Sequence, residues 1–288
     1  MGRLERLLTK ADNFKEAGRY EEAISELTKA LEIAPLDPDV YLSFALTYDS
    51  MGAFNQSIQC FKKALDITPH DPYLWSQLGI TLSRLGRYHG ALEVFHNALN
   101  LDPDCTLARW NRALTFRILG CYEDSIHDLI ECTKSNTNSE YIKNEIHYQL
   151  GLCYFDMGWT SESLIEMRKH VEIFPNDYWA HLSIGNCYQD LGWIDESITK
   201  FDEILGTYPE FIPAYNSLAM SLAEKGWYDE ALDVLRTALR IAPNDESLTE
   251  SINYIDSLKN DDDGNKGLML LSLILHVINR KQATNKSS

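Results

Sequence analysis

Side chains that could perform catalysis or bind a metal are scattered along this 288-residue sequence, and none of them forms a recognisable motif. The titratable and nucleophilic candidates are His70, His89, His96, His127, His147, His170, His181 and His276, together with Cys60, Cys105, Cys121, Cys132, Cys153 and Cys187. There is no glycine-rich phosphate loop, no H-E-x-x-H zinc motif, no G-x-S-x-G nucleophile motif and no C-x-x-C pair. We therefore predict that the protein is not an enzyme and that it needs no cofactor or metal.

Composition narrows the choice of partner and compartment. The formal net charge is −17, whereas a nucleic-acid partner would need clustered basic residues, so we predict no nucleic-acid partner. No signal peptide is recognised at the N-terminus, where the apolar stretch Leu4–Leu8 is short and interrupted by charge. The cysteines are typical of small buried residues in a reducing compartment, with a disulfide or metal-binding function as the alternative. We expect a cytoplasmic protein.

The remaining chemistry is recognition, and the elements that would position it recur at a fixed interval. Glycines follow one another at a constant spacing, with one longer step after the fourth, at Gly18, Gly52, Gly86, Gly120, Gly158, Gly192 and Gly226. A proline follows six of these glycines at one constant distance, at Pro35, Pro69, Pro103, Pro175, Pro209 and Pro243, and Thr137 takes that place in the remaining copy. A stack of identical small units requires such spacing because each unit must present the same face to the next.

The clearest copy contains two apolar stretches at helical spacing, residues 72–85 and 88–101. Gly86 between them permits the positive φ that ends a first helix, and the proline after the second stretch cannot continue a helix. Asp71-Pro72 supplies an N-cap followed by a residue suited to the first helical position. Each unit is therefore predicted to be a helical hairpin.

This copy resembles the tetratricopeptide repeat, a helix-turn-helix unit of about 34 residues. The resemblance is carried by Trp75, Leu78, Gly79, Leu82, Gly86, Tyr88, Ala91, Phe95, Ala98 and Pro103. Seven copies fall in one register, at 4–37, 38–71, 72–105, 106–139, 144–177, 178–211 and 212–245. The resemblance implies an all-α fold, a right-handed superhelical solenoid of antiparallel helix pairs. Small residues such as Gly79, Gly185 and Ala45 are expected where the two helices of a unit cross closely.

The predicted organisation is four repeats over 4–139, an insertion at 140–143 and three repeats over 144–245. Two interpretations of the insertion are open, because four residues make about one helical turn. It either lengthens the next helix or forms a hinge between the two groups of repeats. Residues 246–258 have an apolar stripe and a polar opposite face, which is typical of a helix that closes an array.

A polar, acidic linker over 259–267 precedes an apolar segment over 268–280. The apolar run itself, 268–278, is shorter than the roughly 20 residues that a helix needs to cross a bilayer. Three interpretations remain open. The segment folds back on the last repeats, contacts a membrane through 268–281 with the help of its basic residues, or pairs with another chain.

In the tetratricopeptide repeat family, the first helices line a concave face on which peptides or partner helices bind. Transferred by repeat position, this face is apolar and aromatic in repeats 4 to 6, which suits the apolar anchors of a partner protein. The predicted partner-binding residues are Trp110, Leu114, Tyr148, Leu152, Phe155, Trp179, Leu182 and Asn186. The alternative is that some of these rings pack between helices.

Two polar features belong to the same predicted face. The sixth residue of each repeat is polar and uncharged, which resembles the asparagine ladder of the O-linked N-acetylglucosamine transferase, and such a row could hydrogen-bond a peptide backbone. Its main members are Gln77, Asn111, Gln149, Ser183 and Ser217. The alternative is that an exposed groove position is simply polar. Arg84, Arg109 and Arg117 either receive an acidic partner segment or balance neighbouring carboxylates.

Trp159, Trp193 and Trp227 each follow a turn glycine, so they are expected on one edge of the array. They either stiffen the contacts between repeats or form an exposed ridge for a partner. Taken together, the sequence predicts a non-catalytic scaffold or adaptor that binds a protein or peptide. The alternatives are a membrane-associated assembly factor tethered by the apolar C-terminal segment and a regulatory subunit of a separate enzyme.

Overall fold

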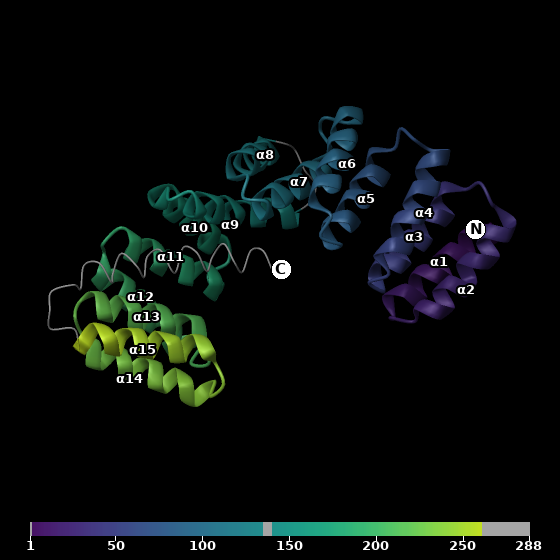
Figure 1. The fold of residues 1–288 in the computed structure, drawn as a ribbon. Coiled ribbons are helices and arrows are strands. Elements are labelled where there is room, and N and C mark those ends of the chain that lie inside the picture. Colours follow the sequence, from purple (N-terminus) through teal and green to yellow (C-terminus); the bar gives the residue numbers. More distant parts are fainter. Residues whose placement is uncertain (1, 135–139, 261–288) are drawn as a thin grey trace. The chain divides into compact units, whose positions relative to one another are not determined.

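The computed structural model describes residues 2–134 and 140–260, which form helices joined by short turns, without a strand among them (Figure 1). The helices are α1 (Arg3–Glu16), α2 (Tyr20–Ile33), α3 (Pro38–Ser50), α4 (Phe54–Ile67), α5 (Pro72–Arg84), α6 (Tyr88–Leu101), α7 (Thr106–Ile118), α8 (Tyr122–Lys134), α9 (Glu140–Asp156), α10 (Thr160–Ile173), α11 (Tyr178–Asp190), α12 (Ile194–Thr207), α13 (Ile212–Glu224), α14 (Tyr228–Ile241) and α15 (Glu246–Asn260). The predicted all-α class is confirmed.

The chain divides into two compact units, Met1–Ile146 and His147–Ser288, which we call unit 1 and unit 2 and describe separately. Unit 1 contains α1 to α8 and the beginning of α9, and unit 2 contains the rest of α9 together with α10 to α15. Within each unit, helices that follow one another in sequence pack together, as α3 does with α4 and α13 with α14. Contacts are therefore local in sequence, as a stack of hairpins requires.

The four residues 140–143 form the first turn of α9. This helix has 17 residues, whereas α3, the corresponding helix of the second repeat, has 13, so the insertion lengthens the helix. The boundary between the two units also lies within α9, shortly beyond Lys143. A hinge at this place remains a prediction.

The ends of the helices follow from the residues expected to cap them. The carboxylates of Asp37, Asp71 and Asp177 accept hydrogen bonds from backbone N–H groups in the first turns of α3, α5 and α11. At the turns within the hairpins, all seven glycines that recur with the repeat have φ between 72° and 80°. A side chain would be strained there, which explains why glycine recurs at this place.

The core of each hairpin pairs a small residue on the first helix with a large one on the second. The large residues are fully buried at one repeat position, namely Leu27, Phe61, Phe95, Leu129, Met167, Phe201 and Leu235. A Cβ atom added to Gly185 would lie 2.4 Å from a ring carbon of Phe201, and one added to Gly151 would lie 2.9 Å from the Met167 methyl carbon. The expected close crossing of the two helices is confirmed at these pairs.

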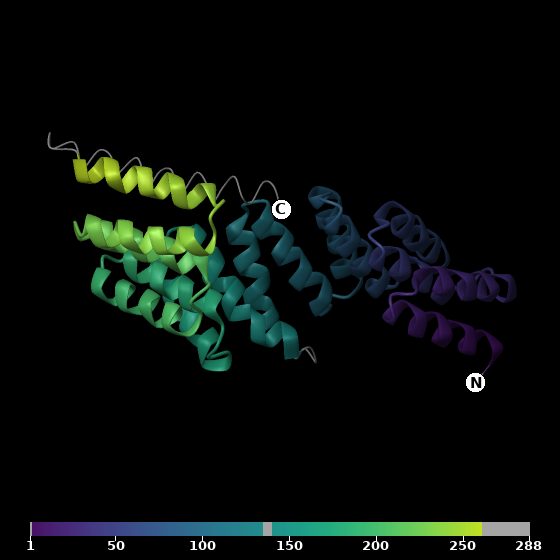
Figure 2. The ribbon, with the colours of Figure 1, turned by 90° about the horizontal axis from the view of Figure 1, so that it is seen from below.

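Helix α15 lies beside α14 and ends the described part of unit 2 (Figure 2). Its apolar side chains Leu248, Ile255 and Leu258 are buried, and its opposite face is exposed to solvent. The linker predicted from residue 259 begins later, because α15 continues to Asn260 and Lys259 forms an ion pair with Asp229. The rest of that linker and the apolar segment 268–280 lie outside the described residues.

Candidate functional site

Trp110, the first of the predicted partner-binding rings, lies in the interior of unit 1. Only 4% of its surface is exposed, and its ring meets that of Tyr141 edge-on with centroids 6.3 Å apart. The expectation that Trp110 is an exposed binding residue is therefore wrong. Tyr141, which belongs to the inserted turn, is the exposed ring at this place, at 67%. Leu114, on the next turn of α7, is half-buried.

Some of the predicted binding residues of unit 2 pack in or beside the core, and others lie at the surface. Tyr148, Leu152 and Phe155 are half-buried and pack beside the core around Met167 and Ile184. Leu182 is buried at 8%, so it belongs to the core rather than to the predicted surface.

Trp179 and Asn186 belong to α11. Asn186 is half-buried, and Trp179 is 47% exposed. The Trp179 ring meets Phe211 edge-on at 4.9 Å, and Tyr178 lies 4.8 Å from the same Phe211 ring. An aromatic cluster, of which Trp179 is the exposed member, thus flanks the beginning of α11.

The five main members of the polar row at the sixth repeat position are half-buried, and they differ in their hydrogen bonds. The Asn111 amide donates to the carbonyl of Leu107 at 2.8 Å, and the Ser183 hydroxyl donates to that of Trp179 at 3.0 Å. Both side chains thus direct a donor to their own helix. By contrast, the Gln149 Oε1 atom is buried, and no donor in the described part of the chain reaches it. Gln77 and Ser217 complete the row.

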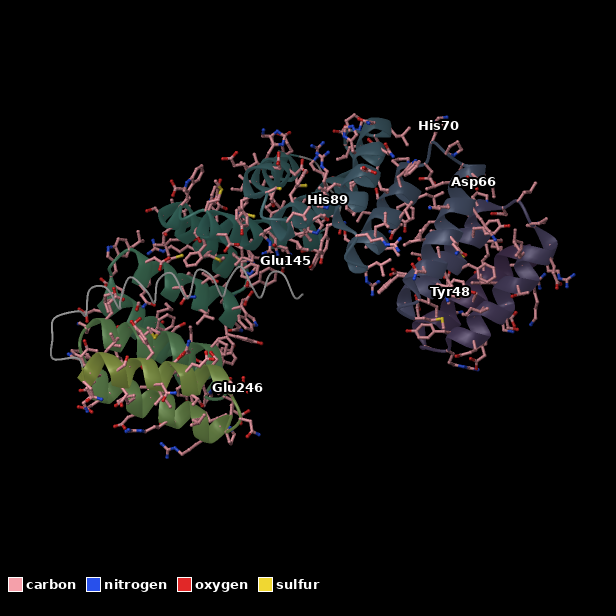
Figure 3. All side chains as sticks on the ribbon, viewed as in Figure 1. Tyr48, Asp66, His70, His89, Glu145 and Glu246 are labelled. Atoms are coloured by element: carbon pink, nitrogen blue, oxygen red, sulfur yellow. The ribbon has the colours of Figure 1, made fainter. Side chains whose placement is uncertain are left out.

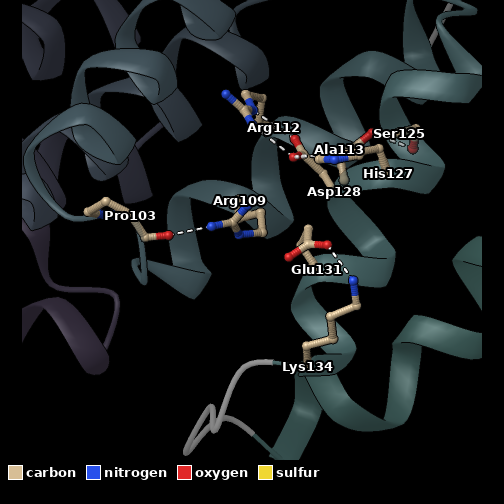
Figure 4. Close-up of polar contacts among 9 residues, drawn as sticks. All are labelled: Pro103, Arg109, Arg112, Ala113, Ser125, His127, Asp128, Glu131 and Lys134. Carbon is tan, nitrogen blue, oxygen red and sulfur yellow. Dashed lines mark hydrogen bonds and ion pairs between the residues drawn. The ribbon is translucent and has the colours of Figure 1, made fainter.

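Two of the three predicted arginines of unit 1, Arg84 and Arg109, have partners within the chain, and Figure 4 shows the contact of Arg109. Arg84 forms an ion pair with Asp49, and its guanidinium also lies 5.1 Å from the Phe54 ring. Arg109 donates to the carbonyl of Pro103. Arg117 is half-buried, and its Nε atom is buried without an acceptor among the described residues.

Arg112 forms a bidentate ion pair with Asp128 (Figure 4). Its Nε and Nη2 atoms lie 2.7 and 2.8 Å from the two carboxylate oxygens, and Asp128 is 1% exposed. These contacts favour charge balance within unit 1 over a preformed site for an acidic partner.

Consecutive first helices are linked by polar side chains that lie about one repeat apart. Thr81 donates to Asp49 at 3.0 Å, and the hydroxyls of Ser83 and Thr115 lie 3.0 Å apart in the same relation one repeat later. In unit 2, Ser251 donates to Asn216 at 2.7 Å. The two partners have the same sequence separation in both pairs of unit 1, and this is the signal that could have identified these links.

The histidines do not assemble a metal site among the described residues. His70 lies between α4 and α5, and His89 lies in the first turn of α6 (Figure 3). In unit 2, the Nδ1 atom of His147 lies 2.6 Å from Glu166, and the Nε2 atom of buried His170 lies 2.9 Å from Asp177. Each of these two histidines thus has a carboxylate partner within its own repeat, and the contact helps to hold the segments of that repeat together.

Glu166 and Cys132 have shifted pKa values with structural causes. Burial raises the pKa of Glu166, but hydrogen bonds from His147 and Lys169 outweigh it and hold that pKa below its ordinary value. All six cysteines are free thiols. Burial raises the pKa of Cys132 to about 12, so this thiol is not a nucleophile at neutral pH.

Half-exposed indoles occupy one edge of unit 2. Trp159, Trp193 and Trp227 are 47–49% exposed and directly precede α10, α12 and α14. The Trp159 ring stacks on Tyr154 with centroids 5.9 Å apart, and Trp193 lies 5.8 Å from Tyr188. Trp159 and Trp193 therefore pack against rings of their own hairpins, and all three indoles leave part of their surface to solvent, which favours the ridge interpretation over burial between repeats.

Comparison with known proteins identifies the fold family. Sequence models of the tetratricopeptide repeat match residues 14–79, 72–105, 145–177 and 212–245, which together span more than half of the chain. The chain belongs to the tetratricopeptide repeat family. No curated protein matches the sequence significantly.

Solved tetratricopeptide repeat structures share the fold at low sequence identity. The C-terminal part of a repeat protein from Cytophaga hutchinsonii is 15% identical, covers 85% of this chain and 99% of its own, and has a TM-score of 0.66. A repeat protein from Parabacteroides merdae is 16% identical, with coverages of 87% and 97% and a TM-score of 0.62. YrrB, described as a tetratricopeptide repeat protein with an unusual peptide-binding site, is 20% identical, with coverages of 66% and 96% and a TM-score of 0.55.

One further contact recurs along this tetratricopeptide repeat chain, and the sequence motifs did not indicate it. The fourth residue of a repeat donates to the carbonyl of the proline that follows the second helix of the preceding repeat. The donors are Tyr41, Trp75, Arg109, His181 and Tyr215. Tyrosine, tryptophan, arginine and histidine share little except a donor, so only their constant separation from the proline could have revealed the contact.

Helices of the described tetratricopeptide repeats fall short of the length and apolarity that crossing a bilayer requires. The membrane-contact interpretation depends on residues 268–281, which lie outside the described part of the chain.

Proposed function

We propose that this tetratricopeptide repeat protein is a cytoplasmic, non-catalytic scaffold that binds an extended peptide or partner segment in unit 2. The family supports a function in protein–protein interaction, and its members are typically not enzymes. The proposed binding surface consists of Gln149, Leu152 and Phe155 on α9 and Asn186 on α11, and we call it the α9–α11 surface.

A single observation carries the proposal, namely the buried Oε1 atom of Gln149, which no donor of the described residues reaches. A buried acceptor without a donor costs free energy, of the order of 1–3 kcal/mol, unless a bound group satisfies it. Gln149 as a whole is half-buried, so a rotation of its side chain would bring Oε1 to the surface. A backbone N–H of an extended peptide is then a donor of the right kind, because main-chain groups are available at regular intervals along such a peptide.

Apolar side chains beside Gln149 would hold the side chains of the same peptide. Leu152 and Phe155 keep part of their surface outside the core, and exposed Trp179 lies at the beginning of α11. Half-buried Asn186 adds a side chain that both donates and accepts hydrogen bonds. Apolar contacts with a few polar groups are the usual composition of a peptide-binding surface.

Unit 1 is the less suitable surface. Trp110 is buried, and Arg84 and Arg109 already have acceptors within the chain. An acidic peptide would have to displace these contacts before it could bind to the arginines.

The experiment selects peptides from a random library against the full-length protein and measures their affinity for variants by titration calorimetry. We expect Gln149→Leu, which removes the acceptor at similar size, and Phe155→Ala each to weaken binding by about tenfold, which corresponds to about 1.4 kcal/mol. Leu42→Ala changes a half-buried first-helix residue of unit 1 and serves as the matched control. Unchanged affinity in both unit 2 variants, or a loss confined to the control, would contradict the proposal.

A further inference from the structure

The edge of unit 2 that carries Trp159, Trp193 and Trp227 is closed between repeats by a recurring ion pair. Lys225 lies in the turn after α13 and pairs with Asp195 in the first turn of α12. Lys259 and Asp229 are the residues one repeat further on, and they form the same pair between α15 and α14. Two successive junctions along this edge, between α12 and α13 and between α14 and α15, are thus each bridged by a lysine and an aspartate.

The next junction along the same edge, between the repeats at 144–177 and 178–211, lacks both members of this ion pair. Leu191 stands where the pattern has lysine, and Ser161 stands where it has aspartate. An open hollow of about 490 Å³ occurs at this place. Its lining comprises Gly158, Trp159, Thr160, Ser161, Glu162, Asp190 and Leu191.

The lining of the hollow suits a basic side chain that has an apolar stem. The exposed face of the Trp159 indole and the side chain of Leu191 offer apolar contact, and Glu162 and Asp190 bring two carboxylates. A lysine or arginine places its methylene groups against such apolar surface and keeps its charge near carboxylates or over an indole ring. The same preference is visible elsewhere along this edge, where the Lys225 ammonium lies 4.7 Å from the centre of the Trp227 ring.

We propose that the hollow and the tryptophan edge bind the C-terminal segment 268–281 of the same chain, with Arg280 or Lys281 in the hollow and the apolar run against Trp193 and Trp227. This surface is distinct from the α9–α11 surface, so the inference goes beyond the proposed peptide binding.

Charge complementarity supports this occupant. Residues 264–288 contain four basic residues and no acidic residue, in a chain whose net charge is −17. Acidic residues recur along the tryptophan edge, because Glu162, Glu196 and Glu230 occupy the same position of three successive repeats. The basic segment and the acidic edge attract each other, and this attraction weakens as salt screens the charges.

Chain length also supports this occupant. The described chain ends at Asn260, next to Lys259, whose ion pair with Asp229 holds the end of α15 at the tryptophan edge. The hollow lies two repeats away, which is at most about 40 Å when neighbouring helix axes are about 8–10 Å apart. Residues 261–280 can span up to about 66 Å when extended, so the segment reaches the hollow with length to spare.

Photo-crosslinking in the full-length protein tests this assignment. A benzoylphenylalanine replaces Val277, the protein is irradiated at low concentration, and the crosslinked peptides are identified by mass spectrometry. We expect crosslinks within one chain to residues 158–162 or 190–193. Glu162→Lys should lower their yield severalfold, and adding Arg280→Glu together with Lys281→Glu should restore it. Asp124→Lys, the same charge reversal at the same repeat position in unit 1, should leave the yield unchanged.

Each of the other outcomes would overturn the proposal. Crosslinks between two chains would make a second copy the occupant, and crosslinks to the α9–α11 surface would assign the segment to the peptide site. Flotation with vesicles that contain anionic lipid provides a further comparison. Binding to vesicles that is insensitive to Glu162→Lys, combined with no crosslink to the hollow, would assign the segment to a membrane surface.

Discussion

Gly79 and Phe95 fit together so closely that a methyl group on the glycine would overlap the ring. A Cβ atom added at Gly79 would lie 2.5 Å from the Cε1 atom of Phe95, and the ring is fully buried. Packed interiors tolerate added volume poorly, because neighbouring side chains must leave their preferred conformations. The pair therefore sets the distance between α5 and α6, and with it the geometry of the third repeat.

Gly79→Ala is expected to destabilise unit 1 by about 1–3 kcal/mol, since the added methyl group must displace the Phe95 ring or separate the helices. The measurement is the urea midpoint followed by circular dichroism. Adding Phe95→Leu should recover part of the loss, because alanine faces leucine at the corresponding positions of the first repeat, Ala11 and Leu27.

Gly90→Ala is the matched control for this prediction. Gly90 lies within α6 and has no neighbouring atom within 4 Å of an added Cβ. Alanine there should raise stability by up to about 1 kcal/mol through its better helix propensity. A loss of stability at both glycines would show that helix propensity and packing are not separable in this repeat.

Asp128→Ala is expected to destabilise unit 1 by about 3–5 kcal/mol, because it leaves the Arg112 guanidinium partly buried without its carboxylate. Arg112→Met together with Asp128→Leu removes both charges at similar volume and should be markedly more stable than Asp128→Ala alone. Thermal unfolding of the two variants measures the difference. If Asp128→Ala unfolds at the wild-type temperature, the bidentate ion pair contributes nothing to the stability of the hairpin.

The acid side of the stability profile should depend on Glu166. Its pKa is lowered in the folded protein by hydrogen bonds from His147 and Lys169 that outweigh burial, so the carboxylate stabilises the fold when ionised. That contribution is complete above the unfolded glutamate pKa of about 4.3 and is lost as pH falls further, through the folded value.

Glu166→Gln therefore should lower the melting temperature at pH 6 to 7, and the difference from wild type should shrink below about pH 4. Melting temperatures between pH 3 and pH 7 measure it. Glu172→Gln, at an exposed position of the same helix, is the control and should show little difference at any pH. A gap between wild type and Glu166→Gln that stays constant down to pH 3 would contradict the prediction.

The sequence predicted the fold well because its signals are local and repeated. Glycine at the turn positions, the Asp71-Pro72 cap and the small residue at Gly185 each act within one hairpin, and seven copies remove the ambiguity of one. The side on which Trp110 lies was not predictable in the same way. Its ring packs against Tyr141, which comes from the inserted turn of α9, and no repeat register specifies that contact.

The hollow beside Trp159 was missed for a different reason. The relevant signal is a departure from a pattern, with Leu191 and Ser161 in the places of a lysine and an aspartate. That departure has meaning only when the pairs Lys225–Asp195 and Lys259–Asp229 are known to touch. Sequence spacing assigns residues to an edge, but it does not give the distances between side chains from different repeats.

Tyr215→Phe tests the recurring contact between the fourth residue of a repeat and the preceding proline. The Tyr215 hydroxyl donates to the Pro209 carbonyl at 2.9 Å, and this bond ties α13 to the turn that precedes it. Its removal is expected to cost about 0.5–1 kcal/mol, at the lower end for a hydrogen bond because water can reach this partly exposed carbonyl. Tyr73→Phe removes a hydroxyl from an exposed ring of α5 and should change stability by less than half as much. Equal effects of the two substitutions on the denaturation midpoint would show that the proline contact adds nothing beyond the general effect of losing a phenolic hydroxyl.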